Sequence, residues 1–253
     1  MAALVAYRAG SVRGVDHEVR APRSTPRFSL RPIHPNGWWL DALMVVGFAA
    51  VTAALLLEPV RQFDLAIRDL ADSNRPAGAD VAAQLVNRLG SGGILSGTVL
   101  VLALLLAWLC RSPWPVAPVI GAFLLTSIVI QPLKLIFHRA APHSPLPDEV
   151  EVRLFSQPDG LSYPSGHAVN TIVWYGVIAL LLAGWLHPTA RRWFRIAPPV
   201  LVAVANVYLG YHWVTDMLAG ICLGILIDRL IARTPWPKVE PPPRSITSDA
   251  ATR

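Results

Sequence analysis

The sequence predicts an all-α membrane protein, built as a bundle of six transmembrane helices with both termini in the cytoplasm. Three observations lead to this fold class. Hydrophobic residues make up 53% of the 253 positions and charged residues 15%, whereas a soluble domain carries about 25% charged residues. The apolar residues form long uninterrupted runs, and the basic residues concentrate in the segments that would lie on one side of a membrane.

The apolar runs are each close to the ~20 residues that a helix needs to cross a hydrocarbon core of about 30 Å. Backbone N–H and C=O groups cannot remain unpaired in lipid, so we expect every run to be helical. The last two runs meet at a polar segment, which predicts a helical hairpin. The six predicted spans are residues 39–57, 93–110, 116–137, 165–186, 196–213 and 214–231.

The distribution of basic residues predicts the orientation. The first 37 residues contain six arginines, and the loop before the fifth span contains three arginines and no acid. In contrast, segments 58–92 and 138–164 contain more acidic than basic residues. Because cytoplasmic loops carry the excess of Lys and Arg, both termini should be cytoplasmic, and these two acidic segments should face outward.

The two ends of the chain differ in composition from the rest. Residues 1–37 and 234–253 are rich in Pro, Arg and small polar residues, so we expect disordered cytoplasmic tails around a membrane domain of residues 38–233. The first tail lacks the apolar core of a cleavable signal peptide, so the first span should act as an uncleaved anchor. Its arginines are spread out, which favours attraction to anionic lipid over binding of nucleic acid.

Between the first two spans, residues 60–90 contain apolar side chains at helical spacing. This pattern predicts two short amphipathic helices along the outer membrane interface. The two cysteines, Cys110 and Cys222, lie inside predicted spans and provide neither a disulfide framework nor a metal-binding spacing.

Four polar residues lie at the ends of predicted spans, where a charged or polar side chain is costly unless it has a function. They are Lys134, His167, His212 and Asp216. The orientation was derived from charge alone, and it places all four at the outer membrane face. We therefore expect them to meet in one site.

The segment Pro164-Ser165-Gly166-His167 has the pattern of a helix start. The free N–H groups and partial positive charge of a helix N-terminus form a ready anion site. Gly166 would allow an anion to approach the backbone, and His167 in the first turn could donate a proton to it. The alternative is a simple helix cap beside an interfacial histidine.

His212 and Asp216 are four residues apart. A carboxylate within reach of an imidazole selects its tautomer and raises its basicity, as a nucleophilic histidine requires. The alternative is that Asp216 caps the last span while His212 extends to the interface. Lys134 offers a compact positive charge suited to phosphate, or could extend to the interface itself. Arg139, five residues later, could add a bidentate phosphate contact.

Together these segments resemble the type 2 phosphatidic acid phosphatase family, which is similar to glucose-6-phosphatase and the vanadium haloperoxidases. The family's Pro-Ser-Gly-His motif is intact at 164–167, and the His and Asp of its third motif are His212 and Asp216. Its first motif keeps Lys134 and Pro142. The resemblance covers roughly residues 60–232. Two arginines of the family pattern are missing, because Ala141 and Asn206 occupy their positions.

The resemblance implies a phosphatase that hydrolyses a lipid phosphate or diphosphate at the outer face, without a metal or other cofactor. His212 would attack phosphorus to form a phosphohistidine, Asp216 would orient it, and His167 would protonate the leaving oxygen. The implied phosphate contacts are Lys134, Arg139, Ser165, Gly166 and Asn206. Since the missing arginines would weaken this site, a lipid-phosphate binder without activity and a phosphotransferase remain alternatives.

Two further expectations concern location and assembly. The heavy use of Ala, Arg and Pro suggests a GC-rich bacterial genome, and therefore the bacterial plasma membrane. Gly220 and Gly224 form a GxxxG motif in the last span, which permits close helix packing. We expect this packing to occur within the bundle, with a dimer as the alternative.

Overall fold

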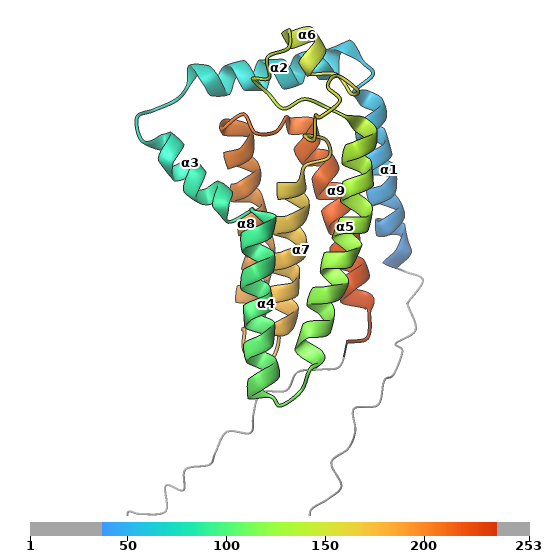
Figure 1. Ribbon diagram of the computed structural model, residues 1–253, viewed down its shortest axis with the longest axis vertical. Helices are drawn as coiled ribbons and strands as arrows, with labels where there is room; N and C mark the ends of the chain where they lie inside the picture. Colours follow the sequence, from blue (N-terminus) through green and yellow to red (C-terminus); the bar gives the residue numbers. More distant parts are fainter. Residues whose placement is uncertain (1–36, 237–253) are drawn as a thin grey trace, which may run out of the picture.

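The computed structural model describes residues 37–236, and within this range it is helical, without β-strands (Figure 1). The predicted tails 1–37 and 234–253 lie almost entirely outside the described residues. The elements are α1 (Trp38–Ala54), α2 (Glu58–Ser73), α3 (Ala79–Arg88), α4 (Gly92–Leu109), a 3₁₀ turn η2 (Trp114–Val116), α5 (Ala117–Phe137), α6 (Asp148–Glu151), α7 (Gly166–Leu181), α8 (Pro188–Tyr208) and α9 (Val214–Arg233).

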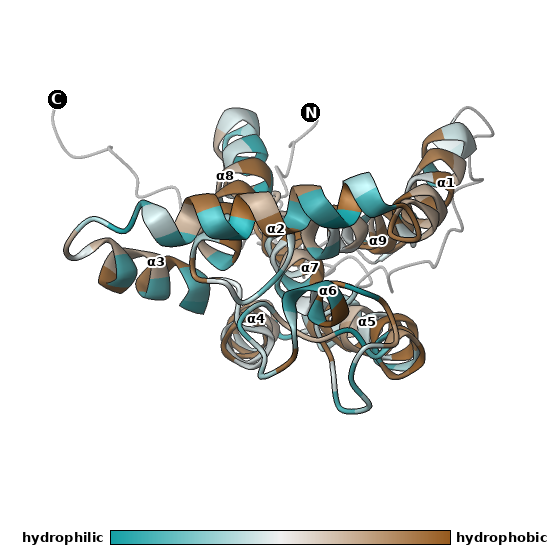
Figure 2. Cartoon of the chain, turned by 90° about the horizontal axis from the view of Figure 1, so that it is seen from above, coloured by the Kyte–Doolittle hydropathy of each residue, from teal (hydrophilic) through white to brown (hydrophobic). Residues whose placement is uncertain are grey.

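Each of the six apolar runs is a helix, which confirms that part of the prediction. Helices α1, α4, α5, α7, α8 and α9 run side by side, and α2 and α6 lie across one end (Figure 1). The view onto that end places α7 among the other helices of the bundle (Figure 2). Accordingly, α7 packs against α4, α5, α8 and α9, and α1 packs against α9.

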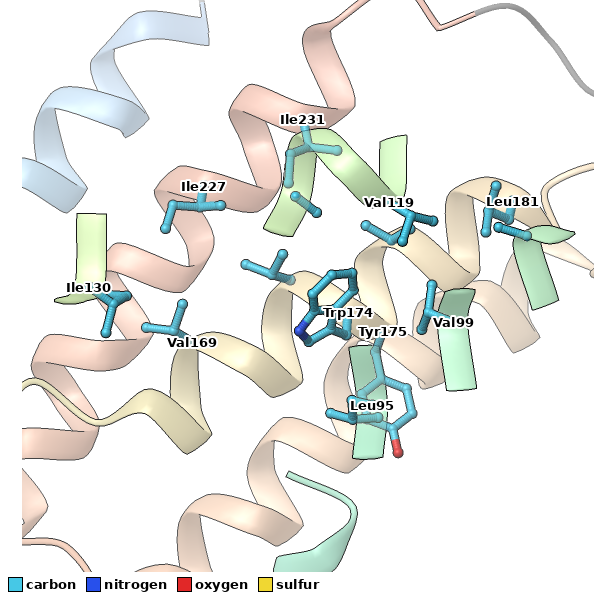
Figure 3. Close-up of a cluster of buried hydrophobic side chains, with 14 of the residues drawn as sticks. Leu95, Val99, Val119, Ile130, Val169, Trp174, Tyr175, Leu181, Ile227 and Ile231 are labelled. Carbon is cyan, nitrogen blue, oxygen red and sulfur yellow. The ribbon is translucent and has the colours of Figure 1, made fainter. Parts of the chain in front are cut away.

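The centre of the bundle is an apolar cluster around α7. Its Val169, Val173, Trp174 and Val177 side chains are buried, and they pack against side chains of α4, α5 and α9 (Figure 3). In a membrane such packing stabilises the bundle chiefly through van der Waals contact, because the lipid chains are as apolar as these side chains. The α7 helix is thus held rigidly, and the residues at its N-terminus have a defined position.

The glycines of the GxxxG motif pack inside the bundle. A Cβ atom on Gly220 would lie 2.6 Å from the carbonyl oxygen of Ser165, and one on Gly224 would lie 3.2 Å from Cα of Val169. These close approaches bring α9 directly against α7. The prediction of packing within the bundle is therefore confirmed.

Two segments are long and apolar enough by themselves to cross a membrane, namely α4 and the joined η2–α5 segment Trp114–Phe137. Helices α1 and α2 meet that criterion only as a pair, and they are bent by 89° at the break between them. Helix α7 is apolar but has only 16 residues. The protein thus has the apolar helices of a membrane protein, while the number of spans remains a prediction.

The amphipathic segment predicted for residues 60–90 forms α2 and α3, as expected. Arg68 fastens α2 to the loop above the bundle through ion pairs with Asp148 (2.9 Å) and Glu151 (2.5 Å). The hydrogen bonds from Arg68 hold the pKa of the Asp148 carboxyl below its usual range. This clamp keeps α2 directly over the polar end of α9.

Candidate active site

The turn between α8 and α9 presents His212. Gly210 has a φ of +67°, a conformation that glycine adopts without strain, and α9 then begins at Val214. In the first turn of α9, Asp216 accepts a hydrogen bond from the Trp213 backbone N–H (3.1 Å). The same oxygen, Oδ2, lies 3.4 Å from Nδ1 of His212. Asp216 therefore both caps the helix and positions the imidazole, so the two alternatives considered from the sequence are not exclusive.

Ser162 is a member of this group that the sequence did not indicate. Its hydroxyl lies 3.2 Å from His212 Nδ1 and donates to Asp216 Oδ2 at 2.5 Å. Both contacts occupy the Nδ1 side of the ring. Among the described residues, Nε2 of His212 makes no hydrogen bond, which leaves this nitrogen available to a substrate.

The start of α7 lies against the same turn. Ser165 caps α7 by accepting a hydrogen bond from the Ala168 N–H, and its own N–H donates to the Asp216 carbonyl oxygen at 3.1 Å. The His167 and His212 rings are 5.6 Å apart between centroids, at an interplanar angle of 66°. The structure thus brings Ser165, His167, His212 and Asp216 together, although they come from two separate helix starts.

The loop before Ser165 is anchored to α1 by Tyr163. Its ring stacks with Phe48, and its hydroxyl shares a hydrogen bond with the Thr52 hydroxyl (2.6 Å). Burial raises the pKa of the Tyr163 phenol to about 12. The phenol is therefore neutral at physiological pH, and it serves to hold this loop in place.

Lys134 reaches the same end of α7 from α5. A Cβ atom on Gly166 would lie 3.6 Å from Cε of Lys134, and the Lys134 ammonium donates to the Leu161 carbonyl oxygen. The positive charge beside His167 comes from this lysine and from the N-terminus of α7. Within residues 37–236, no group of three or more His, Cys, Asp or Glu side chains is arranged to hold a metal ion.

Arg139 occupies a different place from the one predicted. It is fully buried, and its guanidinium donates to the Val152 carbonyl oxygen, to Thr215 Oγ1 (2.7 Å), to Asp216 Oδ1 (2.6 Å) and to Asp64 Oδ2 (2.8 Å). An arginine has five N–H groups, and these five bonds occupy them all. No donor remains for phosphate. The structure therefore does not show the phosphate contact expected from Arg139, which instead donates a hydrogen bond to Asp216, behind His212.

Asp64 completes this buried network from α2. It accepts hydrogen bonds from Arg139, from the Thr215 hydroxyl (2.5 Å) and from the Thr215 N–H (3.2 Å). A signal for it exists in the sequence, because Asp64 falls at helical spacing within an apolar stripe that includes Val60 and Ile67. An acid on the apolar face of an amphipathic helix must find a partner beneath it.

Asn206 lies on α8, buried, and donates through Nδ2 to the Val202 carbonyl oxygen of its own helix (2.8 Å). Its Oδ1 has no partner among the described residues. Asn206 carries no charge, so it does not replace the guanidinium of the family pattern. Val202, one turn earlier, lies close to Gly90, which also lies close to His167. The α3–α4 turn therefore covers the His167 side of the site.

Known proteins resemble this chain in sequence and in fold. Residues 115–240, about half of the chain, match the PAP2 superfamily. The chain is 41% identical over 75 residues to Phosphatidylglycerophosphatase B of Bacillus subtilis (strain 168), covering 28% of this chain and 37% of that protein. It is 42% identical over 77 residues to Undecaprenyl-diphosphatase of Sulfolobus acidocaldarius, covering 29% and 34%. The matched segments thus span about a third of each relative.

The fold agrees with these matches. The crystal structure of a transmembrane PAP2 type phosphatidylglycerolphosphate phosphatase from Bacillus subtilis aligns with a TM-score of 0.61 and 23% identity. The alignment covers 77% of this chain and 94% of that one. Because sequence motifs, superfamily match and fold agree, the chain belongs to the PAP2 superfamily.

Proposed function

We propose that this protein is a membrane phosphatase that hydrolyses a lipid phosphate or diphosphate through a phosphohistidine at His212. The observation that carries the proposal is the pair of imidazoles, His167 and His212, held 5.6 Å apart with Asp216 behind His212. A phosphate between the two rings would have a nucleophile on one side and a proton donor on the other. The two relatives in the superfamily are named as phosphatases of lipid phosphates, which supports the same activity here.

The geometry suggests the order of events. His212 attacks phosphorus through Nε2, while Asp216 and Ser162 hold its Nδ1 side and stabilise the positive charge that develops on the ring. His167 gives its proton to the leaving oxygen and then accepts one from the water that cleaves the phosphohistidine. Lys134 and the free N–H groups at the start of α7 neutralise the phosphate oxygens.

Phosphate release from a panel of lipid phosphates and diphosphates tests this function. We expect the purified wild-type protein to release inorganic phosphate from at least one of them and to show an acid-labile phosphoenzyme during turnover. Binding of lipid phosphate without any release would support the binder alternative. A phosphoenzyme that transfers its group to an added acceptor, with no release to water, would support the phosphotransferase.

We further propose six membrane spans, cytoplasmic termini and an active site that faces outward in a bacterial plasma membrane. The charge distribution supports this orientation, since the acidic segments 58–92 and 138–164 lie at the same end of the bundle as the site (Figure 1). The length of α4 and of the η2–α5 segment supports the membrane location.

A single cysteine in the predicted outer loop tests the orientation. Asp159 is exposed, whereas the nearby Ser156 hydroxyl bonds the Ala140 N–H, so Asp159→Cys is the less disruptive choice. In a background with Cys110 and Cys222 replaced by Ala, we expect Asp159→Cys to react with an impermeant thiol reagent on intact cells. Labelling that occurs only after lysis would reverse the proposed orientation.

A further inference from the structure

Two short helices, α2 and α3, lie outside the six-helix bundle, at the end that carries the candidate active site. Helix α2 crosses this end, and α3 lies beside the bundle (Figures 1 and 2). Both helices expose large apolar side chains, although neither is one of the six long apolar runs. These side chains are Phe63 and Leu70 on α2, Val81 and Leu85 on α3, and Leu89 directly after α3.

The two flanks of α2 differ in what they contact. Arg68 and Asp72 lie one helical turn apart, and the side chains of both bond to the loop of residues 138–164. Phe63 and Leu70 lie two turns apart, and helical geometry places them about 140–160° around the axis from Arg68. The exposed apolar flank of α2 therefore faces away from this loop.

The exposed side chains of α3 form one stripe. Val81, Leu85 and Leu89 are spaced by four residues, so they lie on the same face. Another face of α3 packs against α8. Helix α4 begins at Gly92, soon after the stripe ends, and α4 is long and apolar enough to cross a membrane. The stripe thus lies where the chain enters the membrane, which favours lipid as its covering.

The inner face of α2 holds the turn that carries His212. Asp64 accepts a hydrogen bond from the Thr215 N–H (3.2 Å) in the first turn of α9. The guanidinium carbon of Arg68 lies 5.8 Å from the centre of the Trp213 ring, within the range of a cation–π interaction. Because Trp213 directly follows His212, the position of α2 affects the position of the candidate nucleophile.

The end of α3 lies against the second histidine. Gly90 follows α3, and a Cβ atom on it would lie 3.3 Å from Cδ2 of His167 and 2.4 Å from Val202 of α8. The turn after α3 is therefore packed between α8 and the His167 ring. Residues 74–78 join α2 to α3, so these two connected helices border both histidines of the site.

We propose that the exposed apolar faces of α2 and α3 bind the membrane surface, and that this binding aligns His212 and His167 for turnover. An amphipathic helix buries its apolar face at the boundary between headgroups and acyl chains. The lipid acts here as a surface that holds two helices, and not as the substrate. The alignment part of this inference rests on the proposed phosphatase function, whereas the lipid contact does not.

Fluorescence quenching in nanodiscs of dioleoyl phosphatidylcholine measures the lipid contact. In the background without the two native cysteines, Leu70→Cys or Leu85→Cys carries a bimane label. We expect both labels to be quenched by nitroxide-labelled lipid and shielded from iodide in the water. Gln62→Cys is the matched control, since Gln62 is exposed on the face of α2 opposite Asp64. A label there should be quenched by iodide.

The double variant Phe63→Ser, Leu70→Ser tests the link to turnover. The substrate is p-nitrophenyl phosphate, which is soluble in water, so its delivery does not depend on the lipid. Losing two apolar side chains from the interface should lower kcat in nanodiscs about tenfold, because a smaller fraction of the protein holds the histidines aligned. KM should change little, since the misaligned form still binds phosphate. Both side chains are exposed, so the unfolding temperature should also change little.

Two further variants separate transmission through α2 from a general effect. Val150→Ser is the matched control, because Val150 is exposed on α6 at the same end of the molecule, and it should keep full kcat. Arg68→Gln removes the cation beside Trp213 and should lower kcat by itself. Adding Phe63→Ser and Leu70→Ser to it should then lower kcat by only about threefold or less, because these changes act through the same contact.

The outcomes separate the lipid contact, the alignment and the phosphatase. Iodide quenching at Leu70 and Leu85 as strong as at Gln62 would overturn the lipid contact. Labels shielded from both quenchers, with two copies in each nanodisc, would assign these faces to a second copy of the chain instead. An unchanged kcat in the Phe63→Ser, Leu70→Ser variant would overturn the alignment and leave the phosphatase intact. No hydrolysis of any substrate by the wild type would overturn the phosphatase and the alignment, while the quenching would still decide the lipid contact.

Discussion

Replacing His212 with asparagine is expected to reduce lipid phosphate hydrolysis by about 10⁴-fold or more, as removal of a catalytic nucleophile commonly does. Asparagine preserves a polar group near Asp216 and Ser162, which contact Nδ1 in the wild type, but it has no Nε2 with which to attack phosphorus. The variant should fold, bind lipid phosphate and form no acid-labile phosphoenzyme. Phosphate release and phosphoenzyme trapping measure the two effects.

Two further variants, at His187 and at His167, make this test more specific. His187 caps α8, where its Nδ1 accepts a hydrogen bond from the Thr189 N–H, so His187→Asn retains a capping side chain and should keep full turnover. His167→Asn should instead form the phosphoenzyme from a substrate with a good leaving group and hydrolyse it slowly. Substantial turnover by His212→Asn would rule out His212 as the nucleophile.

Arg139→Met is expected to have the second largest effect, and for a reason that only the structure reveals. The change leaves the buried carboxylates of Asp64 and Asp216 without their shared guanidinium. Breaking a buried ion pair by removing one partner typically costs about 3–5 kcal/mol. The variant should unfold at lower temperature, and turnover should fall by about 10²-fold or more because Asp216 no longer holds His212 in place.

The way in which activity is lost separates a positioning role from phosphate binding. If Arg139 acts through Asp216, Arg139→Met should lower kcat together with thermal stability. Adding Asp64→Asn to that variant should then restore part of the stability, because one uncompensated carboxylate is removed. Arg153→Met is the control, since Arg153 is exposed on the adjoining loop. A raised KM with unchanged stability would instead support the direct phosphate contact predicted from the sequence.

Local patterns account for the part of the site that could be predicted from the sequence. The Pro164-Ser165-Gly166-His167 segment specifies a helix start through its own residue types, and Asp216 lies within one helical turn of the residues that it caps. Spans three to six were predicted to end at one membrane face, and their polar ends do meet. Such features depend on periodicity and short spacing, both of which are visible in a linear chain.

The roles of Arg139, Asp64 and Ser162 could not be predicted in the same way. Arg139 contacts residues 75 and 77 positions away, and Ser162 contacts one 54 positions away. Arg139 lies only five residues after Lys134, but Lys134 is on α5 and Arg139 follows the left-handed residue His138 (φ 43°) that ends the helix. That reversal of the chain carries the Arg139 side chain to the far side of Asp216.

The sequence by itself determined the helices and most of the candidate site residues, because apolar runs of membrane length must form helices and because helix starts carry their own residue signature. The tertiary structure decided that Lys134 lies beside the start of α7, whereas Arg139 lies behind Asp216 and bonds its carboxylate. It also decided that Gly93 and Gly97 face open space, while Gly220 and Gly224 lie in close contact with α7. Both pairs are similar in sequence, and only the neighbouring helix surface distinguishes them.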